Sequence, residues 1–400
     1  MTAEIDLVRA QYEQWVFPLP VENLAGAGKQ MSDPGVMSLS YWPARPQRTG
    51  LDILVAGCGT REAAVLAMHN PDSSIVGIDI SEASLSHSRA LKDRHGLSNL
   101  TLRQVSIEDV ATLGKSFDFV TSYGVLHHLR DPLAGLKALA AVLREDGVMF
   151  LMLYAYYGRA GIYVMQEFFR LLGLAQSKED VDLVRHTLGK VRNDHPAKRF
   201  ASTKDWQFDA GVVDLFLHPR DRPYTVAQCV ELIESAALTI QGWGDQYYYY
   251  PDAYLPHDSE LYQRIDRLPE RQIWQAMELF HGQLIKHHLY VCHARRDPGS
   301  YKVSFDDPSL MDRVPVLLED ARRSRDASGR VVMERPGIGT VAFGEPHASV
   351  VGAIDGRRTI RECVRSGMNR SPGAESAIGR SVFRQLWRVG FAHLAIRPAR

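Results

Sequence analysis

Short apolar segments alternate with helix-like segments from residue 51 onward, and this alternation constrains the fold more than any other feature of the chain. The apolar runs occupy 51–56, 74–80, 99–105, 117–122 and 147–154. Strands that are apolar on both faces and separated by helices form parallel sheets covered by helices on both sides. The sequence therefore predicts an α/β domain.

Two further strands are predicted at 238–243 and 284–293, beyond two interruptions of the pattern. Residues 156–222 are expected to form a mostly helical insertion. Residues 245–282 are expected to form a second insertion, which is rich in tyrosine at its start. We therefore expect a single α/β domain over 50–295.

The two ends of the chain do not continue this alternation of strands and helices. Residues 1–49 are predicted to form an N-terminal arm, because several prolines interrupt regular structure there. Residues 296–400 are expected to form a small, winged-helix-like α+β domain in which short strands flank two helices. The strands are predicted at 339–343 and 391–396, and the helices at 359–366 and 377–389.

Composition and charge narrow the class of protein. The 47 basic residues balance 47 acidic ones, so no overall field favours nucleic acid or an anionic membrane. The first residues lack the apolar region of a signal peptide, and the longest apolar stretch is too short to span a bilayer. Four well-separated cysteines indicate neither a disulfide framework nor a zinc site. We therefore expect a cytoplasmic protein with no metal and no membrane partner.

A glycine-containing turn follows the first predicted strand, where residues 54–60 read Leu-Val-Ala-Gly-Cys-Gly-Thr. Asp79 ends the second strand, 20 residues past Gly59. Glycines let a ligand approach the backbone, and the carboxylate can bind both hydroxyls of a ribose. The pair predicts a nucleotide-type site. The dinucleotide interpretation lacks the third glycine of its fingerprint, since Arg61 and Glu62 stand in that region.

Two segments after the turn favour S-adenosylmethionine over a dinucleotide: Phe-Asp-Phe-Val at 117–120 and Gly-Val-Leu-His-His-Leu at 124–129. Together with Ala-Gly-Cys-Gly-Thr at 56–60, they resemble the class I S-adenosylmethionine-dependent methyltransferase superfamily. The resemblance implies a seven-stranded, mostly parallel Rossmann-like sheet, S-adenosyl-L-methionine as cofactor, and methyl transfer as the activity. It covers 50–155 by motifs and 224–294 by topology alone.

The resemblance also implies ten positions that contact the cofactor. Asp79 would bind the ribose, and Ile80 would pack on the adenine. The remaining positions would line the methionine part, the adenine edge or the floor near the sulfonium: Gly57, Cys58, Gly59, Ser106, Ile107, Glu108, Tyr123 and Gly124.

Three positions depart from the pattern of the superfamily. Val55 stands where many relatives carry an acidic residue, Arg61 stands at the last glycine, and Ser106 stands where an aspartate is often found. A contact to the adenine amino group is therefore expected from Glu108, a backbone carbonyl or water. An N-terminal helix often closes over the cofactor in relatives, and Tyr12 belongs to the aromatic segment that could do so here.

The acceptor is expected at the carboxyl edge of the sheet, where open α/β proteins bind ligands. Both insertions leave the sheet at that edge, so they are expected to form a lid. Candidates for binding the acceptor are Tyr157, Arg159, Arg220, Arg222, Tyr224 and Tyr247. Candidates for removing a proton or orienting the acceptor are His127, His128, His218 and Tyr154, with packing beneath the site as the alternative role for the adjacent histidines.

Methyl transfer to an oxygen, nitrogen or carbon atom of a small molecule is the leading hypothesis. The tyrosine-rich insertion favours it over methylation of nucleic acid, and the fourth strand is not followed by a base-flipping Asn/Asp-Pro-Pro-Tyr motif. A peptide or protein acceptor presented by the C-terminal domain and a cofactor-binding regulator without turnover are the alternatives. The acceptor, the pathway and the oligomeric state are left open.

Overall fold

The computed structural model describes residues 7–45, 48–367 and 372–396. By its internal contacts the chain divides into two compact units. The first unit comprises Met1–Val36, Thr49–Ile240 and Gly282–Ala294, and the second comprises Met37–Arg48, Gln241–His281 and Arg295–Arg400.

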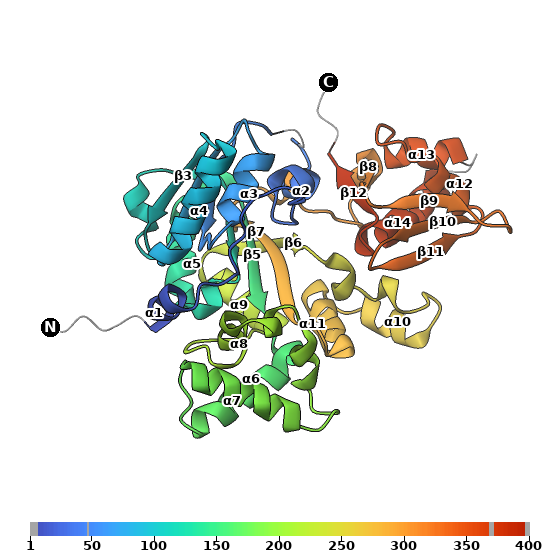
Figure 1. Cartoon of the computed structure of the whole chain (residues 1–400). Helices are drawn as coiled ribbons and strands as arrows, with labels where there is room; N and C mark the ends of the chain where they lie inside the picture. Colours follow the sequence, from blue (N-terminus) through green and yellow to red (C-terminus); the bar gives the residue numbers. More distant parts are fainter. Residues whose placement is uncertain (1–6, 46–47, 368–371, 397–400) are drawn as a thin grey trace. The chain divides into compact units, whose positions relative to one another are not determined.

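A seven-stranded sheet in the order β3-β2-β1-β4-β5-β7-β6 organises the first unit (Figure 1). Neighbouring strands from β3 to β5 pair parallel, and β7 pairs antiparallel with β5. The predicted seven-stranded, mostly parallel sheet is therefore confirmed. The strands are β1 Asp52–Ala56, β2 Ser74–Asp79, β3 Leu100–Gln104, β4 Phe117–Tyr123, β5 Leu143–Tyr154, β6 Leu238–Trp243 and β7 Lys286–His293.

Helices cover the sheet because the strand order reverses between β1 and β4. The chain builds outward from β1 to β3 and then returns to add β4 and β5 on the other side, so right-handed crossovers place helices on opposite faces. Helix α3 (Glu62–His69) packs with α4 (Glu82–His95), and α5 (Pro132–Ala141) packs with α9 (Val226–Ser235). The reversal opens a crevice at the carboxyl ends of β1 and β4, where such sheets bind ligands.

Strand β5 begins four residues earlier than the predicted start at 147. Leu143 pairs with Phe117, and the register then shifts before Phe119. Arg144 forms ion pairs with Asp52 and Asp118 from β1 and β4. The polar segment Arg-Glu-Asp hides this start in the sequence, because it lies at the more exposed first end of the strand and not in the apolar centre of the sheet.

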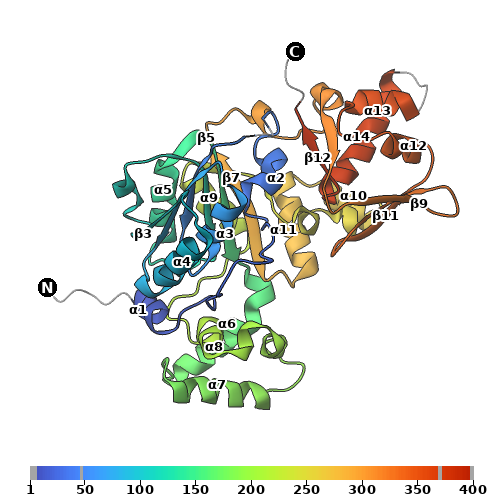
Figure 2. The same ribbon diagram turned by 45° about the horizontal axis from the view of Figure 1, so that its top comes forward.

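Three helices that follow β5 form a group with its own core. They are α6 Tyr156–Leu171, α7 Lys178–Lys190 and α8 Asp209–Phe216, and Figures 1 and 2 both show them together. Buried apolar side chains from all three meet, including Phe169, Val184 and Phe216. The residues after 155 are thus mostly helical, as predicted for the first insertion. Helix α1 (Leu7–Gln14) precedes the sheet and packs on α4.

The second unit includes the segment predicted as the second insertion. Residues 241–281 group with the C-terminal residues rather than with the sheet domain, which differs from the predicted division of the chain. The helices are α2 Pro34–Tyr41, which begins in the first unit, α10 Glu260–Asp266, α11 Glu270–His281, α12 His347–Gly352, α13 Ile360–Gly367 and α14 Pro372–Arg388. Within residues 296–400 two helices were predicted, and the structure has three, α12 to α14. The likeness of this part to a winged helix stays a prediction.

Two small sheets complete the second unit. Strands β9 Arg322–Arg325, β10 Val331–Arg335 and β11 Gly339–Phe343 form an antiparallel sheet, and β8 Val314–Leu317 pairs with β12 Ala392–Ala395. Buried side chains such as Met333 and Phe383 join the strands and helices in one core. Among the described helices, none is both long enough and apolar enough to cross a membrane.

The packing of α6 on the start of β7 can be tested at Gly158. A Cβ atom at this position would lie 1.9 Å from the backbone oxygen of Leu284. We expect Gly158→Ala to lower the free energy of unfolding by about 2–3 kcal/mol, because backbone must move to admit the methyl group. Gly189→Ala in α7 is the matched control, since a Cβ there meets nothing within 4 Å; it should leave stability unchanged or raise it by up to about 1 kcal/mol. Equal denaturation midpoints for both variants would contradict this packing.

Candidate active site

The turn after β1 is held against the end of β2 by backbone hydrogen bonds. The amides of Gly57 and Cys58 both donate to the carbonyl of Ile78 at 2.9 Å. Gly57 has a φ of 76°, and a Cβ on it would lie 2.3 Å from Cγ2 of Val125. Glycine is therefore required both by the backbone conformation and by the side chain that covers the turn.

The Asp79 carboxylate faces this turn. Its Oδ2 accepts a hydrogen bond from the Gly59 amide at 2.8 Å, and its Oδ1 accepts one from the Ser81 amide at 2.9 Å. Burial raises the pKa of Asp79, while the backbone N–H groups of Ser81 and Gly59 oppose that rise. The turn and the carboxylate thus form one hydrogen-bonded unit at the carboxyl edge of the sheet.

A cavity of about 1080 Å³ lies above this unit. Pockets for ligands of drug size span roughly 300–1,000 Å³, so the volume suits a nucleoside ligand together with part of a second molecule. Every position that the resemblance assigned to the cofactor lines the cavity. These residues are Gly57, Cys58, Gly59, Asp79, Ile80, Ser106, Ile107, Glu108, Tyr123 and Gly124.

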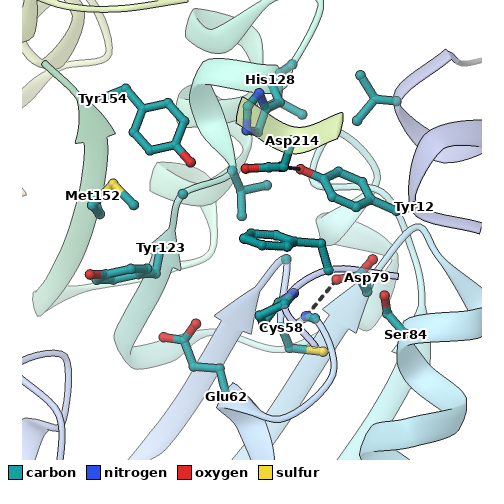
Figure 3. Close-up of a pocket in the computed structure, with 18 of the residues that line it drawn as sticks. Tyr12, Cys58, Glu62, Asp79, Ser84, Tyr123, His128, Met152, Tyr154 and Asp214 are labelled. Carbon is teal, nitrogen blue, oxygen red and sulfur yellow. Dashed lines mark hydrogen bonds between the residues drawn. The ribbon is translucent and has the colours of Figure 1, made fainter. Parts of the chain in front are cut away.

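The lining of the cavity includes a set of polar side chains that we call the polar wall: Tyr12, His128, Tyr154, Arg159 and Asp214. They come from α1, the residues after β4, the end of β5, α6 and α8. Figure 3 shows His128, Tyr154 and Asp214 in the upper part of the cavity and Cys58 and Asp79 in the lower part, with Tyr12 between Asp214 and Asp79. Elements far apart in the sequence therefore converge on one space.

Asp214 is the buried acid of the polar wall. The Tyr12 hydroxyl donates to its Oδ1 at 3.1 Å. Burial raises the pKa of Asp214 to about 7, and the negative charge of Asp221 adds to the rise, whereas Arg159 and the Tyr12 hydrogen bond oppose it. Near neutral pH this carboxyl group therefore exchanges a proton readily.

The three histidines near the polar wall behave differently from Asp214. Burial lowers the pKa of His128, and it lowers the pKa values of His127 and His218 well below the usual range. His128 stacks on His218 with ring centroids 3.9 Å apart, and His127 stacks on Tyr154 at 4.0 Å. All three rings are thus neutral and weakly basic at neutral pH.

The other predicted site residues lie in the cavity lining, in the first unit but outside the described lining, or in the second unit. Arg220 lines the cavity, whereas His127 and His218 are buried and are not among the described residues of its lining. Tyr224 belongs to the backbone link to β5, where its amide donates to the Tyr154 carbonyl at 2.8 Å. Arg222, whose amide donates to the His127 carbonyl, and the partly exposed Tyr157 are likewise absent from the described lining, and Tyr247 belongs to the second unit.

Two residues of the polar wall and the neighbouring His218 are close enough together to bind a metal. His128, Asp214 and His218 offer ligand atoms within 4.8 Å of one another. The Arg220 amide, however, donates to His218 Nδ1 at 3.0 Å, so the neutral ring carries its proton on Nε2, the atom that lies 3.4 Å from the Tyr12 hydroxyl. That nitrogen has no lone pair to give, and we therefore assign no metal to these residues.

Sequence reasoning missed several residues of this site, among them four ionisable side chains. Asp214, Glu62, Lys286 and His288 line the cavity, yet none was a candidate. Lys286 Nζ donates to the Tyr123 hydroxyl at 2.9 Å, and His288 Nε2 lies 3.2 Å from the same oxygen. Glu62 begins the helix that follows the glycine turn. This position close to the turn was the only feature of the sequence that could have identified it as a site residue.

The fold and the cavity define a nucleoside-binding α/β enzyme of the methyltransferase type, and comparisons with known proteins agree. Residues 47–206 match the model of a methyltransferase domain family. An uncharacterized protein of Synechococcus sp. is 31% identical over 283 residues, which cover 68% of this chain and 67% of that protein. The chain belongs to the class I S-adenosylmethionine-dependent methyltransferase superfamily.

Two further matches describe the reach of this relationship. Ubiquinone biosynthesis O-methyltransferase of Neisseria meningitidis is 28% identical over 127 residues, covering 32% of this chain and only 53% of that enzyme. The structure of PKMT2 from Rickettsia typhi in complex with AdoHcy (S-adenosylhomocysteine) superimposes with a TM-score of 0.65 and 14% identity, over 95% of this chain and 78% of that one. The latter likeness concerns the fold. S-adenosylmethionine is the cofactor, and the glycine turn with Asp79 fits it.

The role of Asp79 can be measured by binding. We expect Asp79→Ala to weaken the binding of S-adenosylhomocysteine by about 1–3 kcal/mol, because a buried hydrogen-bonding partner of ligand and Gly59 is lost. Titration calorimetry measures this, and NAD should give no binding heat. Asp72→Ala, an exposed acid before the other end of β2, is the control and should bind normally. An unchanged affinity for the Asp79 variant would remove this carboxylate from the site.

Proposed function

We propose that this methyltransferase acts on a small molecule and methylates an oxygen or nitrogen atom, with Asp214 as the group that accepts the departing proton. Asp214 carries the proposal because it is buried, lines the cavity and has a pKa raised to about 7. When bound, S-adenosylmethionine supplies a methyl group on a sulfonium sulfur; the acceptor atom takes the methyl, the electron pair of the broken C–S bond stays on sulfur, and the proton of the acceptor atom must leave.

The electrostatics of the polar wall favour Asp214 over the histidines that the sequence suggested. A base must be free of protons at the working pH and must bind a proton well enough to take it. The pKa values of His127 and His218 are far below neutrality, so these rings bind protons weakly. Asp214 combines an ionised form at neutral pH with a stronger affinity for protons than an ordinary carboxylate has.

The neighbours of Asp214 supply orientation. Tyr12 donates to Oδ1 and leaves the second carboxylate oxygen for the acceptor. The Arg159 guanidinium lies 3.4 Å from the centroid of the Tyr154 ring and forms an ion pair with Asp221 at 3.2 Å, so it fixes the ring beside the acceptor space. Positioning of this kind contributes much of the rate in a displacement reaction.

The size of the acceptor separates this proposal from its alternatives. Labelled S-adenosylmethionine can be incubated with the full chain and a size-fractionated cell lysate. Label in the small-molecule fraction is the expected result. Label on protein would favour a peptide or protein acceptor, and no transfer to either fraction would favour a regulator that binds the cofactor without turnover.

Replacement of the proposed base should reduce turnover selectively. We expect Asp214→Asn to lower kcat by about 10²–10⁴-fold, which is the usual contribution of a general base, while the affinity for S-adenosylhomocysteine stays the same. Asp209→Asn on the same helix is the control, since Asp209 forms ion pairs with Lys178 and Arg185 outside the cavity lining. Its activity should match the wild type. A fully active Asp214→Asn enzyme would refute the role of this carboxylate.

The pH dependence gives a second test. Because Asp214 must be ionised to accept a proton, kcat/KM should rise with pH through a midpoint near 7 and level off above that midpoint. Tyr12→Phe removes a hydrogen bond that lowers the pKa of Asp214, so the midpoint of the profile should move to higher pH. Infrared titration of the carboxyl band of Asp214 checks the same shift without an acceptor. Tyr156→Phe, at an exposed position, should leave the midpoint in place.

A further inference from the structure

Glu62 places a second carboxylate on the cavity wall, apart from Asp79. It is the first residue of α3 and follows the glycine turn, so its backbone is fixed by the same hydrogen bonds that hold the turn. It lines the cavity and is partly buried. Neither the cofactor positions implied by the superfamily nor the proposed chemistry at Asp214 uses it.

The surroundings of Glu62 leave its charge poorly compensated. The Thr121 hydroxyl lies 3.4 Å from Oε1, which is long for a hydrogen bond between two oxygens. Burial raises the pKa of Glu62 to about 7, whereas the hydroxyl groups of Thr121 and Ser32 and then the positive charge of Arg61 oppose the rise. No ion pair to Glu62 is formed by the residues that the structure describes. A buried carboxylate in this condition gains free energy when a cation binds beside it.

The position of Glu62 relative to Asp79 indicates which positively charged group could bind beside Glu62. Both carboxylates act electrostatically on the Cys58 thiol, so Cys58 lies near each of them. Figure 3 shows Asp79 and Glu62 on opposite sides of Cys58, with Tyr123 on the side of Glu62. If Asp79 holds the ribose, the amino-acid part of the cofactor extends past the turn toward Glu62.

The sequence departure at Val55 gives an independent reason to look for a displaced acid. Val55 stands where many relatives carry an acidic residue, and its side chain is apolar and buried. The carboxyl end of β1 therefore offers no carboxylate for a positively charged group, while Glu62 offers one seven residues further along the chain.

We propose that the Glu62 carboxylate binds the α-ammonium group of the methionine part of the cofactor. The inference depends on the cofactor and not on the acceptor or on Asp214. Pairing with an ammonium group keeps Glu62 ionised and fixes the end of the cofactor opposite the ribose. Glu62 is thus a binding residue that takes the place of the acid absent at Val55.

A pair of ligands isolates this contact. S-adenosylhomocysteine carries the ammonium group, whereas 5′-deoxy-5′-methylthioadenosine keeps the adenosine and sulfur but lacks the amino-acid part. We expect Glu62→Gln to weaken S-adenosylhomocysteine about 10- to 100-fold, as for loss of a charged hydrogen-bonding partner. Binding of 5′-deoxy-5′-methylthioadenosine should be unchanged. Calorimetry on the full chain measures both affinities.

Glu108→Gln is the matched control, since Glu108 also lines the cavity but is expected at the adenine edge. Both ligands contain the adenine, so the ratio of their two affinities should stay at the wild-type value in this variant. Equal weakening of both ligands by Glu62→Gln, or no weakening of either, would overturn the proposal for Glu62 and would leave that for Asp214 untouched.

A measurement on the wild type covers the case in which Glu62→Gln fails to fold. The ionisable groups acting on Glu62 are Arg61, which stays charged, and Cys58, whose pKa burial raises well above its usual value. Binding of an ammonium group should therefore release a proton from Glu62 near pH 7. Calorimetry in buffers of different ionisation enthalpy should show proton release for S-adenosylhomocysteine and none for 5′-deoxy-5′-methylthioadenosine. Equal proton release with both ligands would also overturn the proposal.

Discussion

The hydrogen bond from the Gly59 amide to Asp79 is the contact on which the rest of the site depends. It joins the turn after β1 to the end of β2 at 2.8 Å, and the Ser81 amide completes the partners of the same carboxylate. Burial of Asp79 is unfavourable unless such donors are present. The two amides therefore stabilise the carboxylate and also fix the height of the turn beneath the cavity. Each oxygen of Asp79 accepts one backbone hydrogen bond and keeps a second lone pair, which can accept a hydrogen bond from a ribose hydroxyl.

Two further carboxylates in the same cavity have fewer partners. Glu62 and Asp214 both have pKa values raised to about 7 by burial. Neither carboxylate accepts a hydrogen bond from the amides of the turn. Their hydrogen-bond partners among the described residues are neutral hydroxyl groups, of Tyr12 for Asp214 and of Thr121 and Ser32 for Glu62. Burial of weakly paired carboxylates lowers the free energy of unfolding. A ligand that brings a cation or a proton close to them can offset this loss. Asp79 therefore stabilises the turn as well as lining the cavity, whereas Glu62 and Asp214 are expected to gain their strongest interactions only when ligands bind.

The sequence predicted the sheet, and the positions that it assigned to the cofactor line the cavity, because both features depend on local patterns. Apolar runs marked the strands, and the turn, Asp79 and the segment after β3 occupy neighbouring strand ends. Asp214 could not be found in this way. It lies in a short, buried helix with no motif, and its partner Tyr12 is 202 residues away. The grouping of 241–281 with the C-terminal residues was equally hidden, since strand patterns do not show which core a helical segment joins.

The adjacent histidines illustrate how a motif can serve the fold of a site rather than its chemistry. The Arg220 carbonyl accepts from His128 Nδ1 at 2.8 Å, the Arg220 amide donates to His218 Nδ1, and the Arg222 amide donates to the His127 carbonyl at 3.2 Å. The chain after α8 is thereby fastened to the segment after β4. Since α8 carries Asp214 and the segment after β4 lines the cavity, these bonds help to hold Asp214 beside that segment. Neutral rings suit this task, because a charged imidazole beside Arg159 would be repelled.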